Sequence, residues 1–373
     1  MKKIICAVLA FIFVFALFAC NNDGGVEDHT GEVYEDFGNV AGDYLFYSAR
    51  TKIRDFEPVL KYDVHSGKIS TLCPDPFCTH MDDDCFFHSV AFMTYIGNKV
   101  YFAKKDVKTG KHGIYEFDVD KESGEFIYYS DTLIYQITSY YYDLYFKAAK
   151  SINYKKLNTK TKELSELKNA DYGDTINSIR NGKIVWYKQT DSDVSYYITD
   201  LDGNMIEENV KGSVSTGLYK YRSELHDKER RNIAFDKYLT KPGEEEKLIF
   251  ENVGPGGPYK DVYIGFDVYD SDKYERFFSG LWVSDADGSN KKVLFSDPDR
   301  KVNLSHWTTT NNNLVCGDYV GIILGPENYT PSAEEVYDEN GVPQGDYEQY
   351  PECDMLIINI RTGEYKIARY EFG

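Results

Sequence analysis

Beyond residue 18 the sequence lacks long apolar runs, and no later stretch reaches the 18 residues expected of a membrane-spanning helix. It also lacks the His-Glu-x-x-His motif of zinc metalloproteases and the Gly-x-Ser-x-Gly motif of serine hydrolases. Long stretches with helical periodicity are few. These absences argue against a membrane-embedded body, against two common hydrolase classes and against a helical fold.

Positive charge is scarce as well. The chain has 42 Lys and Arg against 61 Asp and Glu, and its formal net charge is −19. Such a surface repels the phosphates of nucleic acids and the headgroups of anionic lipids. We therefore expect no nucleic-acid partner, and we interpret the charge as keeping a monomeric protein in solution.

The one long apolar run lies near the N-terminus, over residues 4–18, and Lys2 and Lys3 precede it. It is too short to cross a bilayer as a helix, and a positive start followed by such a run is typical of a secretory signal peptide. The run ends in Leu17-Phe18-Ala19-Cys20. This ending resembles the bacterial lipobox, in which an aliphatic residue and a small residue precede a cysteine that becomes acylated.

The lipobox resemblance implies a signal peptide over residues 1–19 and lipid attachment, such as palmitate, at Cys20. Residues 20–30 are polar and acidic and contain glycine, which predicts a flexible tether. We expect an extracytoplasmic protein that is lipid-anchored to the cell membrane, or to the outer membrane in a Gram-negative host. The alternative is an ordinary signal peptide that is cleaved at another position.

A repeated hairpin pattern runs through the rest of the chain. Each copy has an aromatic or apolar strand, a turn rich in Asp, Gly, Asn or Thr, and a second strand. The turn centres fall near residues 65, 121, 159, 202, 243, 287 and 362. Several copies follow a further strand pair, so the repeating unit has four strands over roughly 40 residues, which is the period of a propeller blade.

The pattern predicts an all-β protein with a single β-propeller domain over residues 31–373, built of four-stranded blades. The 33 Tyr and 22 Phe support this class, because aromatic residues favour strands. Seven copies suggest seven blades, with six or eight as alternatives. Insertions at 73–88 and 326–353 explain the two longer intervals. An ordinary β-sandwich is the alternative fold, although it does not require such even spacing.

Two copies carry a more specific motif, in which a strand ends in Asp-x-Asp-Gly. They are Leu281-Trp-Val-Ser-Asp-Ala-Asp-Gly-Ser-Asn290 and Tyr197-Ile-Thr-Asp-Leu-Asp-Gly-Asn204. Both resemble the repeat of TolB-like propellers, and the chain as a whole is similar to uncharacterised TolB-like β-propeller lipoproteins of Firmicutes. The resemblance implies the propeller fold. Because the other copies depart from the Asp-Gly pattern, it implies no TolB role in an envelope complex.

The first insertion contains the only motif with chemical character, made of Cys73, Cys78, His80 and Cys85. Three thiolates and one imidazole form a common tetrahedral set for a structural Zn²⁺. The loop is short enough to wrap one ion, and its two prolines reduce the entropy lost on ordering. A structural Zn²⁺ is therefore the one candidate cofactor.

Two other interpretations of this loop stay open. Export favours a disulfide between two of its three cysteines, and Cys316 and Cys353, which flank the second insertion, are candidates for another. If Cys20 is acylated, pairing alone leaves one cysteine over, whereas a metal site absorbs three. The third interpretation is a reactive thiol with His80 or His88 as its base, but nothing else in the sequence points to that chemistry.

These features together predict a surface-tethered propeller that binds an unknown protein or glycan ligand without catalysing a reaction. Propellers present variable loops around one face and a central channel, which suits recognition. A propeller-fold enzyme that processes glycans or peptides is the first alternative, and it requires a pair of carboxylates in the central funnel. A purely structural scaffold in envelope assembly is the second.

Overall fold

The computed structural model describes residues 42–48, 59–78, 80, 85–88, 90, 92–151, 153–168, 174–189, 194–210, 219–226, 234–254, 256–268, 277–296, 302–303, 315–324 and 354–369. The predicted signal peptide, Cys20, the tether over 20–30 and the insertion over 326–353 lie outside these ranges. Within them all the regular elements are strands, and no helix has the length and apolar content needed to cross a membrane.

Four separate antiparallel sheets come first, and strands that follow one another in the sequence pair side by side. The first sheet has three strands, β1 (Tyr44–Ser48), β2 (Val59–Asp63) and β3 (Ile69–Thr71). The second contains β4 (Met93–Ile96), β5 (Lys99–Lys105), β6 (His112–Asp118) and β7 (Ser123–Ser130). The third contains β8 (Ile134–Tyr140), β9 (Asp143–Ala148), β10 (Lys155–Asn158) and β11 (Leu164–Glu166). The fourth contains β12 (Thr175–Arg180), β13 (Lys183–Gln189), β14 (Val194–Asp200) and β15 (Met205–Val210).

The remaining strands form one connected network of three further meanders. The first is β16 (Lys220–Leu225), β17 (Phe235–Thr240) and β18 (Lys247–Val253). The second is β19 (Gly257–Tyr259), β20 (Val262–Val268), β21 (Phe277–Asp285) and β22 (Lys292–Ser296). The third is β24 (Val315–Cys316), β25 (Tyr319–Leu324), β26 (Asp354–Asn359) and β27 (Tyr365–Arg369). They are joined by one residue pair between β18 and β20, and by β23 (Val302–Asn303), which pairs with both β21 and β25.

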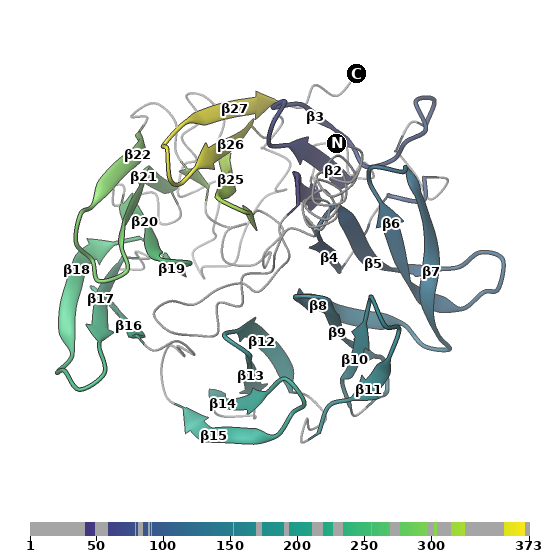
Figure 1. Ribbon diagram of the computed structural model, residues 1–373, viewed down its shortest axis with the longest axis horizontal. Coiled ribbons are helices and arrows are strands. Elements are labelled where there is room, and N and C mark those ends of the chain that lie inside the picture. Colours follow the sequence, from purple (N-terminus) through teal and green to yellow (C-terminus); the bar gives the residue numbers. More distant parts are fainter. Residues whose placement is uncertain are drawn as a thin grey trace, which may run out of the picture.

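The meanders follow one another around a ring in sequence order, from purple to yellow in Figure 1. The ring closes by packing, since Leu45 and Leu60 of the first sheet share a buried cluster with Met355 and Ile357 of the last meander. The predicted all-β propeller with four-stranded blades is therefore confirmed. The blade count of seven stays a prediction, because the first sheet and the β16–β18 meander have three strands each within the described residues.

Local turn chemistry explains why the repeats fold as hairpins. The Oδ1 atoms of Asp63, Asn158 and Asn359 each accept hydrogen bonds from the backbone N–H groups two and three residues later, at 2.8–3.0 Å. Gly67 and Gly363 follow in the left-handed region, with φ of 74° and 79°, where only glycine avoids a steric cost. All seven predicted copies are antiparallel hairpins.

Aromatic side chains fill the interfaces between neighbouring sheets. Trp186 of the fourth sheet is fully buried, and its ring lies 5.1 Å from that of Tyr154, which precedes β10 of the third sheet. Trp186 also stacks on Tyr197 at 5.7 Å with an interplanar angle of 8°. Such contacts each contribute about 0.5–1.5 kcal/mol beyond the area that they bury. Trp186 thus packs both across to the third sheet and against Tyr197 of its own sheet.

Candidate metal centre

The loop that carries the cysteine cluster leaves the first sheet directly after β3. Leu72 is fully buried, and its N–H donates to the carbonyl oxygen of Val59 at 2.7 Å, which continues the pairing of β2 and β3. The Thr71 hydroxyl donates to the carbonyl oxygen of Cys73 at 3.3 Å. Cys73 is therefore held close to the end of a rigid strand.

A tight turn brings Cys78 back toward Cys73. The Asp75 carboxylate accepts the N–H of Phe77 at 2.9 Å, and its carbonyl oxygen accepts the N–H of Cys78 at 3.3 Å. Prolines on both sides of Asp75 fix φ and favour this reversal. His80 then adopts a φ of 58°, in the left-handed region that histidine tolerates better than most residues.

Two adjacent phenylalanines attach the other end of the loop to the second sheet. The Phe87 ring lies 4.8 Å from Phe117 of β6, edge to face, and 5.8 Å from Phe102 of β5. The Phe86 ring lies 4.6 Å from that of Tyr115, also edge to face. The loop thus starts on the first sheet and ends on the second, with Cys85 at the start of the anchored segment.

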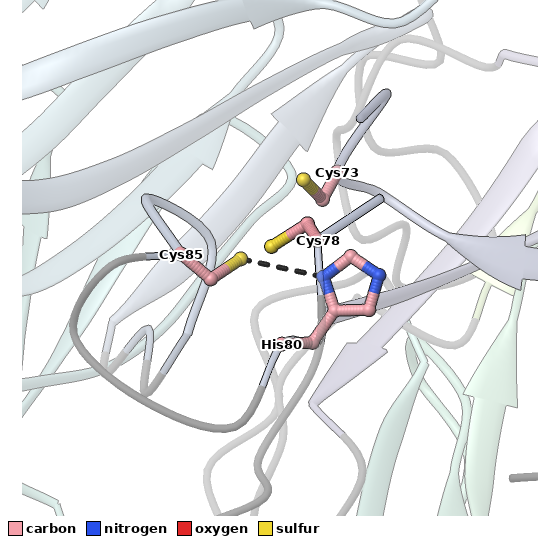
Figure 2. A group of neighbouring side chains, drawn as sticks. All are labelled: Cys73, Cys78, His80 and Cys85. Carbon is pink, nitrogen blue, oxygen red and sulfur yellow. Dashed lines mark hydrogen bonds between the residues drawn. The ribbon is translucent and has the colours of Figure 1, made fainter. Parts of the chain in front are cut away.

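The structure brings all four predicted ligands together, as Figure 2 shows. One ligand atom from each of Cys73, Cys78, His80 and Cys85 lies within 4.8 Å of the others. His80 Nδ1 lies 3.4 Å from the Cys85 sulfur. A tetrahedral Zn²⁺ with bonds of about 2.3 Å to sulfur and about 2.0 Å to nitrogen needs ligand separations of roughly 3.5–3.8 Å. The donors therefore fit such an ion after inward shifts of about 1 Å at most.

Burial controls the protonation of these groups. Cys85 is 2% exposed, and desolvation raises the pKa of its thiol to about 12. Desolvation likewise raises the pKa of Cys73 and lowers the pKa of His80. The neutral imidazole is the form that binds metals. The raised pKa values of Cys73 and Cys85 favour protonated thiols, and a divalent ion supplies the positive charge that favours thiolates.

The remaining predicted cysteine sites have different outcomes. Cys73, Cys78 and Cys85 are free thiols in the structure, so the disulfide interpretation and the metal interpretation both stay predictions. Cys316 is buried on β24, where its thiol donates to the carbonyl oxygen of Gly42. Its predicted partner, Cys353, lies outside the described residues, as does Cys20.

A buried lysine on β17 went unnoticed in the sequence. Lys237 is only 4% exposed, and its ammonium group donates to the Ser223 hydroxyl at 3.0 Å. It also lies 4.7 Å from the centroid of the Phe235 ring. Desolvation lowers the pKa of Lys237 to about 8. In the sequence it stands as an ordinary charged residue of a strand, and only the packing of the meander reveals its burial.

No protein-family model and no curated protein matches this sequence. Among solved structures, the chain is similar to the β-propeller domain of the Trilobed protease from Pyrococcus furiosus, with 11% identity, a TM-score of 0.48, and coverage of 90% of this chain and 97% of that domain. It is also similar to TolB from Acinetobacter baumannii, with 11% identity, a TM-score of 0.40, and coverage of 69% and 63%. For the acylaminoacyl peptidase of Pyrococcus horikoshii the identity is 13%, the TM-score 0.47 and the coverage 76% and 46%.

Proposed function

We propose that this chain is a lipid-anchored extracytoplasmic β-propeller that binds a ligand or protein partner without catalysis, and that Cys73, Cys78, His80 and Cys85 hold a structural Zn²⁺ in it. The observation that carries the metal assignment is the convergence of three sulfurs and one imidazole nitrogen within 4.8 Å. This donor set is soft, and it is the set that Zn²⁺ commonly takes in structural sites.

The composition of the site supports a structural role for the ion. Four protein ligands close a tetrahedral shell, whereas catalytic zinc keeps one position for water or substrate. The loop also links two sheets, because it begins beside β3 and its last ligand precedes the phenylalanines packed on β5 and β6. An ion at this position fixes the junction between the first and second blades.

The lipid anchor and the binding role are supported by different features. The lipobox-like ending at Cys20 and the polar segment after it support a lipid-anchored position on a membrane surface outside the cytoplasm. The chain forms a ring of antiparallel meanders, and propellers in general present variable loops in an arrangement suited to recognition. The proposed partners are a glycan or another envelope protein.

Cobalt substitution tests the metal site. The full-length lipoprotein, purified in detergent, is stripped with chelator under reducing conditions and titrated with Co²⁺. A bound tetrahedral thiolate site gives intense visible bands and a sulfur-to-cobalt charge-transfer band that saturate at one ion per chain. The charge-transfer band weakens in Cys78→Ser and stays unchanged in Cys316→Ser. Absence of the bands in the wild-type protein rejects the site.

A glycan array tests the binding role. The purified lipoprotein is applied to immobilised envelope glycans, and each bound glycan is then analysed by mass spectrometry. Retention of a defined glycan with its mass unchanged supports non-catalytic binding. Cleavage of the bound glycan contradicts it and favours an enzyme.

A further inference from the structure

We infer that Cys73 and Cys78 form a peroxide-sensitive site, in which a disulfide between them and the bound Zn²⁺ are alternative states of the same loop. The inference rests on the proposed metal site. It adds a reaction, an oxidant class and a pair of residues that the metal assignment alone does not supply.

The arrangement of the sulfurs favours this exchange. Each of the three sulfurs lies within 4.8 Å of the others, and none forms a disulfide within the described residues. Figure 2 shows the Cys78 sulfur between those of Cys73 and Cys85. An S–S bond is about 2.0 Å long, so a modest movement of the loop joins two of these atoms. The site thus stands close to both a metal-bound and an oxidised arrangement.

The difference in solvent exposure identifies Cys73 and Cys78 as the two cysteines that are oxidised. Cys73 and Cys78 are partly exposed, whereas Cys85 is 2% exposed and packs with Phe87 in the core between the first two sheets. A small oxidant in solution therefore reaches Cys73 and Cys78 first. The turn around Asp75 already directs the chain from one of these cysteines back to the other. Cys85 keeps its thiol, and His80 is unchanged.

Hydrogen peroxide is the oxidant class that fits the site, because it is small and uncharged. Two zinc-bound thiolates give two electrons to one peroxide molecule, whose O–O bond breaks. Peroxide first converts one cysteine to a sulfenic acid. The sulfur of the other cysteine then attacks it, and the S–S bond forms. The reduction of peroxide by two thiolates gives two hydroxide ions, and two protons from the buffered solvent convert these into two water molecules. Cys73 and Cys78 could then no longer bind a metal ion, and only His80 and Cys85 would remain to hold it.

The consequence for the fold is local. The first sheet is held to the second partly by this loop, while Phe86 and Phe87 keep their own contacts on the second sheet. Oxidation therefore replaces a link between the two sheets by a link within the segment that leaves β3. The junction between the first and second blades loosens, and the rest of the ring keeps its packing.

Graded peroxide treatment of the zinc-loaded, full-length protein tests the inference. Released zinc is followed with a chromogenic chelator, and the cross-link by peptide mass mapping. We expect the amount of zinc released to rise in proportion to the amount of a disulfide-linked peptide that contains Cys73 and Cys78. Dithiothreitol with added zinc should reverse both changes. Cys316→Ser responds like the wild type, whereas Cys73→Ser forms no such cross-link.

The outcomes separate this inference from the metal assignment. If the reduced protein binds no zinc, the proposed metal site fails, and the inference fails with it. If zinc binds but peroxide leaves it in place, or releases it without linking Cys73 to Cys78, only the inference fails. Release together with the reversible link between Cys73 and Cys78 supports both.

Discussion

Removing the metal should lower the melting temperature of the wild-type protein but not that of Cys78→Ser. The perturbation is a chelator added to the reduced, zinc-loaded, full-length protein in detergent. Cys78 supplies one of the four converging ligands, and serine removes the thiolate while keeping the size of the side chain. The loop then has three ligands, one of them uncharged, and we expect it to bind the ion much more weakly.

The expected shift follows from mass action. An ion present at a thousand times its dissociation constant stabilises the folded state by about 4.1 kcal/mol. Unfolding entropy near the melting temperature is about 2.1 cal/mol/K per residue, or roughly 0.7 kcal/mol/K for a domain of about 350 residues. Chelation should therefore lower the melting temperature of the wild type by about 6 °C.

Differential scanning calorimetry on matched samples measures this effect. The quantity compared is the shift caused by chelator within each variant, because any cysteine substitution also changes packing on its own. Cys316→Ser is the control: its thiol is buried outside the loop, so its chelator shift should equal that of the wild type. A wild-type shift near zero, or an equal shift in Cys78→Ser, refutes the reasoning.

Three further predictions concern other parts of the chain. Phe87→Ala removes a ring packed against the second sheet and should lower the free energy of unfolding, measured with denaturant, by about 3–5 kcal/mol. Phe77 lies in the same loop but is 92% exposed, so Phe77→Ala should change this free energy by less than about 0.5 kcal/mol. Burial lowers the pKa of Lys237 from 10.5 to about 8. Between these two values the folded state binds fewer protons than the unfolded state, so the free energy of unfolding rises with pH across that window. Lys237→Met should be more stable than the wild type at pH 7 by up to about 3 kcal/mol and should lack this rise, and equal pH profiles of unfolding for the two proteins would contradict the burial argument. Cys20→Ala should lose incorporation of a labelled palmitate analogue and leave the membrane fraction on cell fractionation, and continued labelling would place the lipid elsewhere.

The repeats were predictable because their information is local. Asp63 and Gly67 lie within one turn, and their preferences for capping backbone N–H groups and for positive φ act whatever the rest of the chain does. The same holds for Asn359 and Gly363 at the other end of the ring. A period of roughly 40 residues then predicts blades, since a single meander cannot bury both of its faces.

The candidate site was predictable only in part. Spacing singled out Cys73 to Cys85, but spacing alone does not tell a metal from a disulfide, because both need the sulfurs close together. The anchor at Phe86 and Phe87 was missed, although two adjacent aromatic residues directly after the last cysteine were a visible signal. Its partners on β5 and β6 belong to another sheet, so the contact depends on tertiary packing.

Long-range features could not be derived from local patterns. The buried Lys237 stands in a strand whose sequence alternates like many others, and its burial depends on how the β16–β18 meander packs. Ring closure joins Leu45 to Met355 across most of the chain, and no repeat carries information about that contact.

Zinc and free thiols counted together on the reduced, full-length protein test the metal centre most directly. The protein is purified from membranes in detergent without chelator, its zinc is measured by mass spectrometry, and thiols are titrated before and after chelation. We predict about one zinc per chain in the wild type and in Cys316→Ser, and little in Cys78→Ser. The Cys73, Cys78 and Cys85 thiols should react with the thiol reagent much faster once zinc is removed. A reduced protein that binds no zinc, and whose Cys73, Cys78 and Cys85 thiols react as fast before chelation as after it, would contradict this account.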